Sequence, residues 1–332
     1  MLNSRSFGLL LLIALVMLAA CAPLEPAQPP AISTDTASTG VPAGQVARAA
    51  ITPAALGNLS YTGIFPTQPI TLTDGYYDYT DGSTGRSFVR FIDHLIARGD
   101  LNGDGAEDAV VLLEDNTGGT AHFLYAAVVL DARGNPTPTE AVMVGDRIGV
   151  KSLVIDESQV VVDIVAQGPG DAACCASWNV RKRFALEGGR LVERSSNELS
   201  KISLHDLDGT RWRLVDLKAN QEPALPDTEI TMRVADGQIS GFAGCNDYDS
   251  TVASQEGSAQ SFIVGSIVIT KSLCPAPAAN QEASYLARLG RAVAWSYDAG
   301  YLAITYATGD GAFAKMVFAP YPVGATLRSK KE

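Results

Sequence analysis

Short apolar runs separated by turn-forming residues dominate the chain between residue 51 and about residue 200. The runs are rich in Val, Ile, Leu and Phe, and Gly, Asp and Pro stand between them at intervals of about ten residues, which is typical of a sheet protein. No long window has a 3.6-residue apolar stripe, so we expect few and short helices. The predicted strands are Ser87–Ala97, Ala109–Leu113, Phe123–Leu130, Ala141–Val144, Lys151–Ile155, Val160–Val165 and Val180–Leu186.

A second unit begins near Leu204, where the pattern changes. Alternating apolar residues predict a strand that contains Ile230, Met232 and Val234. Asp236-Gly237 follows, a pair suited to the positive φ angles of a two-residue hairpin turn.

Beyond this hairpin the apolar period becomes helical from Gln281 to Val293, and Asn280 is placed to cap the helix. Alternation returns at residues 302–306, and Lys315–Phe318 is predicted to be the closing strand. The second unit is therefore expected to run sheet, helix, sheet. The fold class is predicted to be mainly β, with two β-rich domains.

The first apolar run of the chain, Phe7–Ala20, lies behind Arg5 and is shorter than the about 20 residues that a membrane-spanning helix needs. It ends in Leu18-Ala19-Ala20-Cys21, which resembles a bacterial lipoprotein cleavage and lipidation site. This resemblance implies that the Cys21 thiol takes a diacylglycerol and that the new amino terminus is acylated. An ordinary secretory signal with an incidental cysteine is the alternative.

Residues 21–50 are mostly Pro, Ala, Ser and Thr, which cannot bury enough surface to fold, so this segment is predicted to be a tether. The expected location is the cell envelope, outside the cytoplasm, with the lipid in the outer membrane or in the outer face of the cytoplasmic membrane. The predicted organisation is a signal peptide (1–20), the lipidated cysteine and tether (21–50), a β-rich domain (51–200), a second domain (201–322) and a polar tail (323–332).

The chain has a formal charge of −11, and loss of Arg5, one positive charge, makes it −12. This charge argues against nucleic acid as a partner, and an anionic membrane surface would repel it. Contact with the membrane therefore depends on the lipid.

The second unit carries a set of short motifs in a fixed order. They are Leu207-Asp208-Gly209-Thr210, Trp212, Leu214, Gly241-Phe242-Ala243-Gly244-Cys245-Asn246, Cys274-Pro275, Glu282, Leu286 and Leu289. In these motifs the unit resembles the META domain over residues 204–320, a family that includes a heat-shock-inducible bacterial envelope protein. The resemblance implies a small β-barrel-like sheet with one helix, usually without enzymatic activity and often found in lipoproteins.

Cys245 and Cys274 occupy the two cysteine positions of this family, and the resemblance implies a disulfide between them. Two buried thiols are the alternative. Cys174 and Cys175 are neighbours in the sequence and could bridge to each other or separately, and no nearby residue completes a four-ligand metal site.

One loop has the oxygen spacing of a calcium site. Its candidate ligands are Asp100, Asn102, Asp104, the Ala106 carbonyl and Asp108, with Gly105 at the sharp turn. Val111 stands where an EF-hand has its bidentate Glu, so any affinity is expected near 10⁻⁴ to 10⁻³ M. The alternative is a polar turn that feeds the next strand. The first unit also resembles a domain of other bacterial lipoproteins that carry the same Gly99–Gly105 stretch.

The sequence contains no nucleophile elbow, phosphate loop or His-Glu-x-x-His helix. We therefore expect a binding or structural protein and not an enzyme. The alternatives are a calcium-dependent module that binds an envelope polymer, and a hydrolase or hydrolase inhibitor. Three groups are expected to have structural or surface roles: the histidines His94, His122 and His205, the core tryptophans Trp178, Trp212 and Trp295, and the solvated carboxylates Glu107, Glu114 and Asp115.

Overall fold

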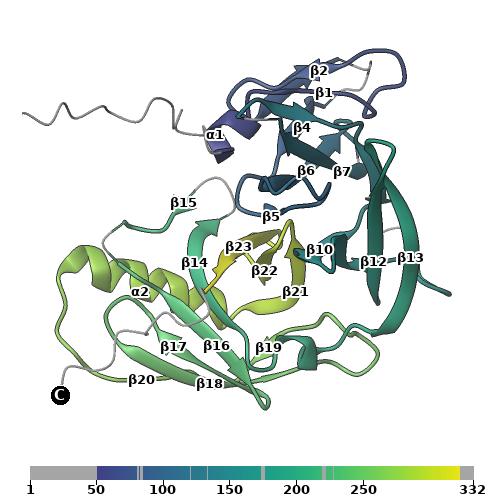
Figure 1. Cartoon of the computed structure of the whole chain (residues 1–332). Coiled ribbons are helices and arrows are strands. Elements are labelled where there is room, and N and C mark those ends of the chain that lie inside the picture. Colours follow the sequence, from purple (N-terminus) through teal and green to yellow (C-terminus); the bar gives the residue numbers. More distant parts are fainter. Residues whose placement is uncertain are drawn as a thin grey trace, which may run out of the picture. The chain divides into compact units, whose positions relative to one another are not determined.

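The structure is a computed structural model that describes residues 51–321, apart from residues 81, 83–84, 120, 133, 173–175, 219–221 and 227. Ala47–Glu332 form one compact unit. The predictions for Cys21, Cys174 and Cys175, and for the signal, tether and tail, lie outside the described residues. In the part that is described, the chain is mainly β, as predicted (Figure 1). No helix in this part is long and apolar enough to cross a membrane.

The first sheet is built around β6, whose run Ala109–Leu113 is buried on both faces. Ala109, Val111 and Leu113 face a core shared with α1 (Pro53–Leu56), β1 (Ser60–Tyr61) and β2 (Ile70–Thr71). Val110 and Leu112 face the second sheet. The strands of the first sheet are β3 (Tyr76–Tyr79), β4 (Ser87–Phe91), β5 (Ala97–Gly99), β6 (Asp108–Asn116), β7 (His122–Asp131), β8 (Pro136–Pro138) and β9 (Val142–Asp146).

The prediction of one strand over Ser87–Ala97 is wrong. β4 pairs with the end of β6, with Phe91 opposite Leu113, whereas β5 pairs with its beginning, with Ala97 opposite Val110. The chain turns at Asp93-His94 between the two strands. This turn places two strands along one edge of β6.

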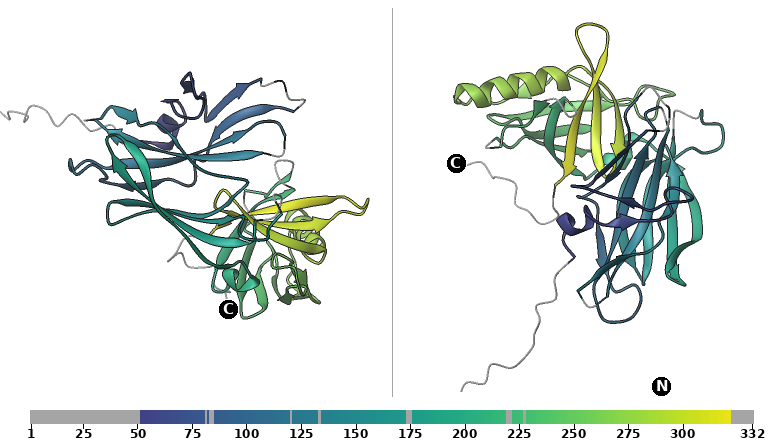
Figure 2. Two further views of the ribbon diagram at one scale, coloured as in Figure 1. Left: turned by 90° about the vertical axis from the view of Figure 1, so that its right-hand side faces the viewer. Right: turned by 90° about the horizontal axis from the view of Figure 1, so that it is seen from above.

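The second sheet packs against the first through a shared apolar core, and Figure 2 shows the two sheets face to face. Its last strand was not predicted, because the sequence of β13 is mostly polar and its side chains are mostly exposed. The strands, in order, are β10 (Gly149–Asp156), β11 (Gln159–Ala166), β12 (Trp178–Glu187) and β13 (Arg190–Lys201).

The third sheet follows the short 3₁₀ helix η1 (Leu204–Leu207) and closes on itself. Its strands β16 and β17 form the predicted hairpin, with Asp236 at φ 51° and Gly237 at φ 72°. The strands are β14 (Arg211–Lys218), β15 (Glu222–Pro223), β16 (Thr231–Ala235), β17 (Gln238–Phe242), β18 (Asp247–Ala253), β19 (Ile263–Val264), β20 (Val268–Ile269), β21 (Ala292–Asp298), β22 (Tyr301–Ala307) and β23 (Phe313–Pro320).

Closure occurs beside β19, where Ser261 forms a bridge with Ala294 of β21. The Phe262 N–H donates to the Val293 carbonyl at 3.0 Å, and the Trp295 N–H donates to the Gln260 carbonyl at 2.8 Å. The two ends of the sheet therefore meet, which agrees with the predicted barrel-like sheet.

The helix α2 (Ala276–Leu289) begins earlier than predicted, so Asn280 lies inside it and does not cap it. The N-cap is Pro275, and a second proline follows in the first turn, where its fixed φ favours helix initiation. The periodicity misses this start because residues 276–280 are only Ala, Pro and Asn, which form no apolar stripe. The helix also ends earlier than predicted, at Leu289, and Val293 lies in β21.

The tip of the β21–β22 hairpin belongs to the core between the first two sheets. Ala299, at φ 48°, packs in that core, and the Gly300 N–H donates to the Val150 carbonyl at 2.9 Å. A Cβ on Gly300 would lie 3.3 Å from the Leu95 side chain. The domain boundary near residue 200 stays a prediction, and this hairpin connects the sheets on either side of it.

Candidate functional site

A cavity of about 490 Å³ lies beside this hairpin tip, and we call it the junction pocket. It takes residues from the α1 region, from the turn before β3, from β4 and the turn after it, and from β22. Its ionisable, amide and aromatic side chains are Asn58, Asp74, Tyr76, Arg90, Phe91, Asp93, His94 and Tyr301. The pocket thus collects residues that are far apart in the sequence.

His94 and Tyr301 form one wall of the junction pocket. Their rings stack with centroids 3.8 Å apart and an interplanar angle of 11°. His94 Nε2 lies 2.6 Å from the Ala299 carbonyl, which can only accept, so this nitrogen donates. The hydrogen bond to Ala299 agrees with the structural role predicted for His94. The residue also lines a cavity that the sequence pattern did not reveal.

A charged cluster lies next to the pocket on β4, β6 and β7. Arg90 stands opposite Glu114 in the sheet register, and its Nε donates to Glu114 Oε2 at 2.5 Å. His122 Nδ1 donates to Glu114 Oε1 at 2.9 Å, and Arg90 also lies 3.8 Å from Asp298. The Glu114 side chain is only 15% exposed, so the expectation of a solvated carboxylate is wrong for this residue.

The hydrogen bonds in this cluster shift the pKa values of Glu114 and His122. Burial raises the pKa of the Glu114 carboxyl, but the hydrogen bonds from His122 and Arg90 outweigh burial and hold that pKa below its usual range. The hydrogen bond to Glu114 raises the pKa of His122 above its usual range. Each group thus favours the charged form of the other.

These shifts predict a pH-dependent contribution to stability. The part due to Glu114 is present above its unfolded pKa of about 4.3 and is lost as pH falls through the folded value. The part due to His122 is present below its unfolded pKa of about 6.5 and is lost as pH rises through the folded value. His122→Gln should therefore lower the melting temperature more at about pH 5.5 than at about pH 8.5.

Thermal unfolding at both pH values measures this difference. The pH dependence should disappear in a Glu114→Gln background, which removes the partner. Equal losses at both pH values would show that the pair does not titrate as proposed.

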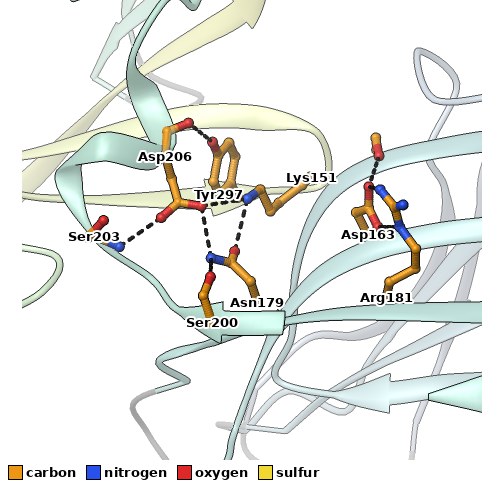
Figure 3. A network of polar contacts seen from close by, with 9 residues as sticks. Lys151, Asp163, Asn179, Arg181, Ser200, Ser203, Asp206 and Tyr297 are labelled. Atoms are coloured by element: carbon orange, nitrogen blue, oxygen red, sulfur yellow. Dashed lines mark hydrogen bonds and ion pairs between the residues drawn. The ribbon is translucent and has the colours of Figure 1, made fainter. Parts of the chain in front are cut away.

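A second polar network connects the second and third sheets (Figure 3). Lys151 Nζ donates to Asp206 Oδ1 and to Asn179 Oδ1, both at 2.9 Å. Asn179 Nδ2 donates to the same Asp206 oxygen at 2.8 Å, and the Ser203 N–H donates to Asp206 Oδ2. Burial raises the pKa of Asp206, but these bonds hold it below its usual range. The link to the third sheet is Tyr297 of β21, whose hydroxyl donates to the Asp206 carbonyl at 3.4 Å.

The predicted calcium loop is arranged around its own backbone amides. Asp100 accepts from the N–H groups of Gly103 and Gly105, at 2.7 and 2.9 Å. The buried Asp108 accepts from Leu101 N–H and Asp131 N–H. Gly105 has the expected positive φ, 80°.

The remaining candidates behave in the same way, since Asn102 accepts from Asp104 N–H and Asp104 accepts from Ala106 N–H. Across the described ranges, no three His, Cys, Asp or Glu side chains are grouped so that they could hold a metal ion. This arrangement is what the turn interpretation expects, and calcium binding stays a prediction.

The disulfide Cys245–Cys274 is present, with its Cα atoms 6.0 Å apart. Beside it, Asn246 and Glu282 form a buried pair. The Asn246 N–H and Nδ2 donate to the two carboxylate oxygens of Glu282 at 2.6 and 2.9 Å. Asn246 Oδ1 accepts from Ser272 N–H and Thr270 Oγ1. The sequence identified both residues as family positions but gave no sign that they meet.

The tryptophans and His205 agree with the roles expected from the sequence, and Asp115 does not. Trp212 and Trp295 are buried in the third-sheet core and Trp178 packs against the core of the first two sheets. His205 is exposed and bonds to Asp208, and Asp115 is buried, which corrects the expectation of a solvated carboxylate.

Comparison with known proteins identifies a family for the residues that form the third sheet. The family model described as the META domain matches residues 205–316, so the C-terminal half of the chain contains a META domain. Among solved structures, one described as "NMR structure of the protein from Burkholderia xenovorans" is 20% identical and has a TM-score of 0.29. That match covers 39% of this chain and 96% of the other. No curated protein matches the chain.

Proposed function

We propose that this protein is a lipid-anchored, extracytoplasmic envelope protein that binds a ligand in the junction pocket without transforming it. The observation that carries the proposal is the pocket itself. The META domain supplies Tyr301 through β22, and the first sheet supplies Arg90 and His94. A concave site that takes residues from separate elements is a frequent form of ligand site.

Binding is favoured over catalysis by the state of the ionisable groups in the pocket. Arg90 is held by Glu114, and His94 donates its Nε2 hydrogen to the Ala299 carbonyl. A general base has to be within reach of the proton that it removes, and a nucleophile has to lie beside such a base. The pocket side chains are better suited to orienting a ligand.

The lining suits a neutral polar ligand such as a sugar unit of an envelope glycan. Tyr76 is 46% exposed and brings an aromatic ring to the pocket, and the carboxylates of Asp74 and Asp93 can accept from hydroxyl groups. The envelope location rests on the Leu18–Cys21 signal and on the META resemblance, whose family includes a stress-induced envelope protein. The tether of residues 21–50 then allows the folded part to stand about 30 Å from the membrane.

Tyr76→Ala should weaken glycan binding at least about tenfold, because the loss of an aromatic contact in a binding site costs about 1.4 kcal/mol or more. The measurement is binding of the detergent-purified protein to immobilised envelope glycans. Phe313→Ala, which removes an exposed aromatic side chain from β23 outside the pocket, is the matched control. Equal binding by the Tyr76 variant would exclude this pocket, and cleavage of the glycan would show that the protein is an enzyme.

Cys21→Ser should release the protein from membranes or leave an unprocessed precursor, because the thiol that carries the lipid is lost. Membrane fractionation and mass spectrometry of the mature amino terminus measure both outcomes. An unmodified wild-type terminus at a residue other than Cys21 would refute the lipid anchor.

A further inference from the structure

We propose that three arginines on the outer surface of the META domain form a binding site for a phosphate-bearing ligand. Arg211 and Arg213 lie on β14, and Arg233 lies on β16. We call this group the arginine face. It lies on different strands from the residues that line the junction pocket, so it does not depend on the function proposed for that pocket.

The sheet places the three side chains on the same surface. In β14 the residue between the two arginines, Trp212, is buried in the barrel core, and in β16 Met232 and Val234 are buried likewise. The register sets Arg211 directly opposite Arg233. Because side chains alternate between the faces of a strand, all three arginines point outward.

No direct ion pair neutralises these charges in the described part of the chain, and the nearby carboxylate of Glu229 is engaged by Tyr321. None of the three arginines forms a salt bridge there, although acidic residues outnumber basic ones by 36 to 25 in the sequence. The acidic residue in the same cross-strand row, Asp249, is two strands away from Arg233, beyond Ser240. Like charges placed directly opposite each other destabilise a sheet pair. An anion between Arg211 and Arg233 would remove that cost.

A cavity of about 200 Å³ lies at this pair. It is lined by Arg211, Trp212, Thr231, Met232, Arg233, Ser240, Gly241 and Tyr321. Ser240 adds a hydroxyl donor beside the guanidinium groups. The cavity is thus a local concentration of hydrogen-bond donors and positive charge on an acidic protein.

Phosphate fits this geometry better than a carboxylate does. A carboxylate has two oxygens, and one guanidinium can engage both of them. A phosphate group offers oxygens to more than one guanidinium, so Arg211 and Arg233 could hold it together, with Arg213 near its outer side. A phospholipid headgroup and a phosphorylated envelope polymer share this chemistry.

The test compares thermal unfolding of the detergent-purified protein in inorganic phosphate and in chloride of equal ionic strength. Phosphate should raise the wild-type melting temperature in a saturable manner, because a ligand that binds only the folded state stabilises it. In the Arg211→Gln, Arg233→Gln double variant this rise should be lost. The control is Lys315→Gln, which removes one exposed positive charge from β23 of the same sheet and should keep the rise.

The melting temperature in chloride shows whether the double variant is folded. In chloride the double variant should melt at or above the wild-type temperature, because a like-charge pair has been removed. If the wild type shows no phosphate-dependent rise, or the double variant shows the same rise, the site does not exist.

Flotation of the Cys21→Ser protein, taken from the soluble fraction so that no anchor lipid inserts into the vesicles, then distinguishes the two sources of phosphate. Protein that binds anionic phospholipid vesicles through the two arginines, but not purely zwitterionic ones, supports a headgroup ligand. Protein that responds to inorganic phosphate and floats with neither vesicle supports a phosphorylated polymer at the same site. A failure of glycan binding at the junction pocket would not change the expected results of the unfolding and flotation experiments.

Discussion

Glu282→Ala is expected to lower the free energy of unfolding by about 3 kcal/mol, since it leaves buried donors without an acceptor. Asn246 and Glu282 are only 5% and 8% exposed, so bulk solvent does not reach the donors that the carboxylate satisfies. Two hydrogen bonds are removed, and both end on a charged group, which makes them stronger than neutral ones. The effect is transmitted to the segment before Cys274, because Asn246 Oδ1 also holds Ser272.

Urea denaturation measures this effect. Glu282→Gln should be intermediate, because its amide oxygen can still accept from one Asn246 donor while its NH₂ group meets the other. Glu256→Ala, at an exposed position of the same domain, should change stability by less than about 0.5 kcal/mol. If Glu282→Ala is as mild as this control, the buried pair does not hold the turn between β17 and β18 to α2.

Replacing both disulfide cysteines, Cys245→Ser with Cys274→Ser, should cost about 3.5 kcal/mol of unfolding free energy. The bridge closes a loop with a sequence separation of 29, and in the chain-entropy account its loss gives the unfolded chain more freedom. Because the effect lies mainly in the unfolded state, the variant should keep the wild-type circular dichroism spectrum.

Denaturation with and without a reducing agent provides the check. The reduced wild type should be as unstable as the double variant, and the double variant itself should not respond to reduction. A wild-type protein whose midpoint is unchanged by full reduction would show that the bridge contributes nothing to stability.

The strands that the sequence predicted well are those whose burial is visible in composition. Ala109–Leu113 is apolar throughout because β6 has a core on each face, and the Asp236-Gly237 turn has the residues that its positive φ angles require. β13 was missed because a strand with little buried surface has no apolar pattern to detect. The start of α2 was misplaced because residues 276–280 contain only Ala, Pro and Asn and so give no apolar stripe.

The candidate site was largely beyond sequence reasoning. His94 and the Ala299 carbonyl are 205 positions apart, and no local spacing can indicate that they meet. The disulfide was predicted because a family resemblance aligned the two cysteines, and the meeting of Asn246 with Glu282 needed the folded chain. Contacts between residues on different strands can be predicted only when the pairing register of the strands is known.

Closure of the third sheet also bears on aggregation. An open sheet edge exposes unpaired backbone groups that can add a strand from another molecule. The contact between Ser261 and Ala294 joins the sheet's ends, so this part of the chain offers little backbone for such addition. The second sheet ends in β13, which carries charged residues along an exposed strand, a feature that discourages edge pairing. At the envelope location proposed above, where neighbouring copies would share one membrane surface, these two features would keep the molecules from joining through their strands.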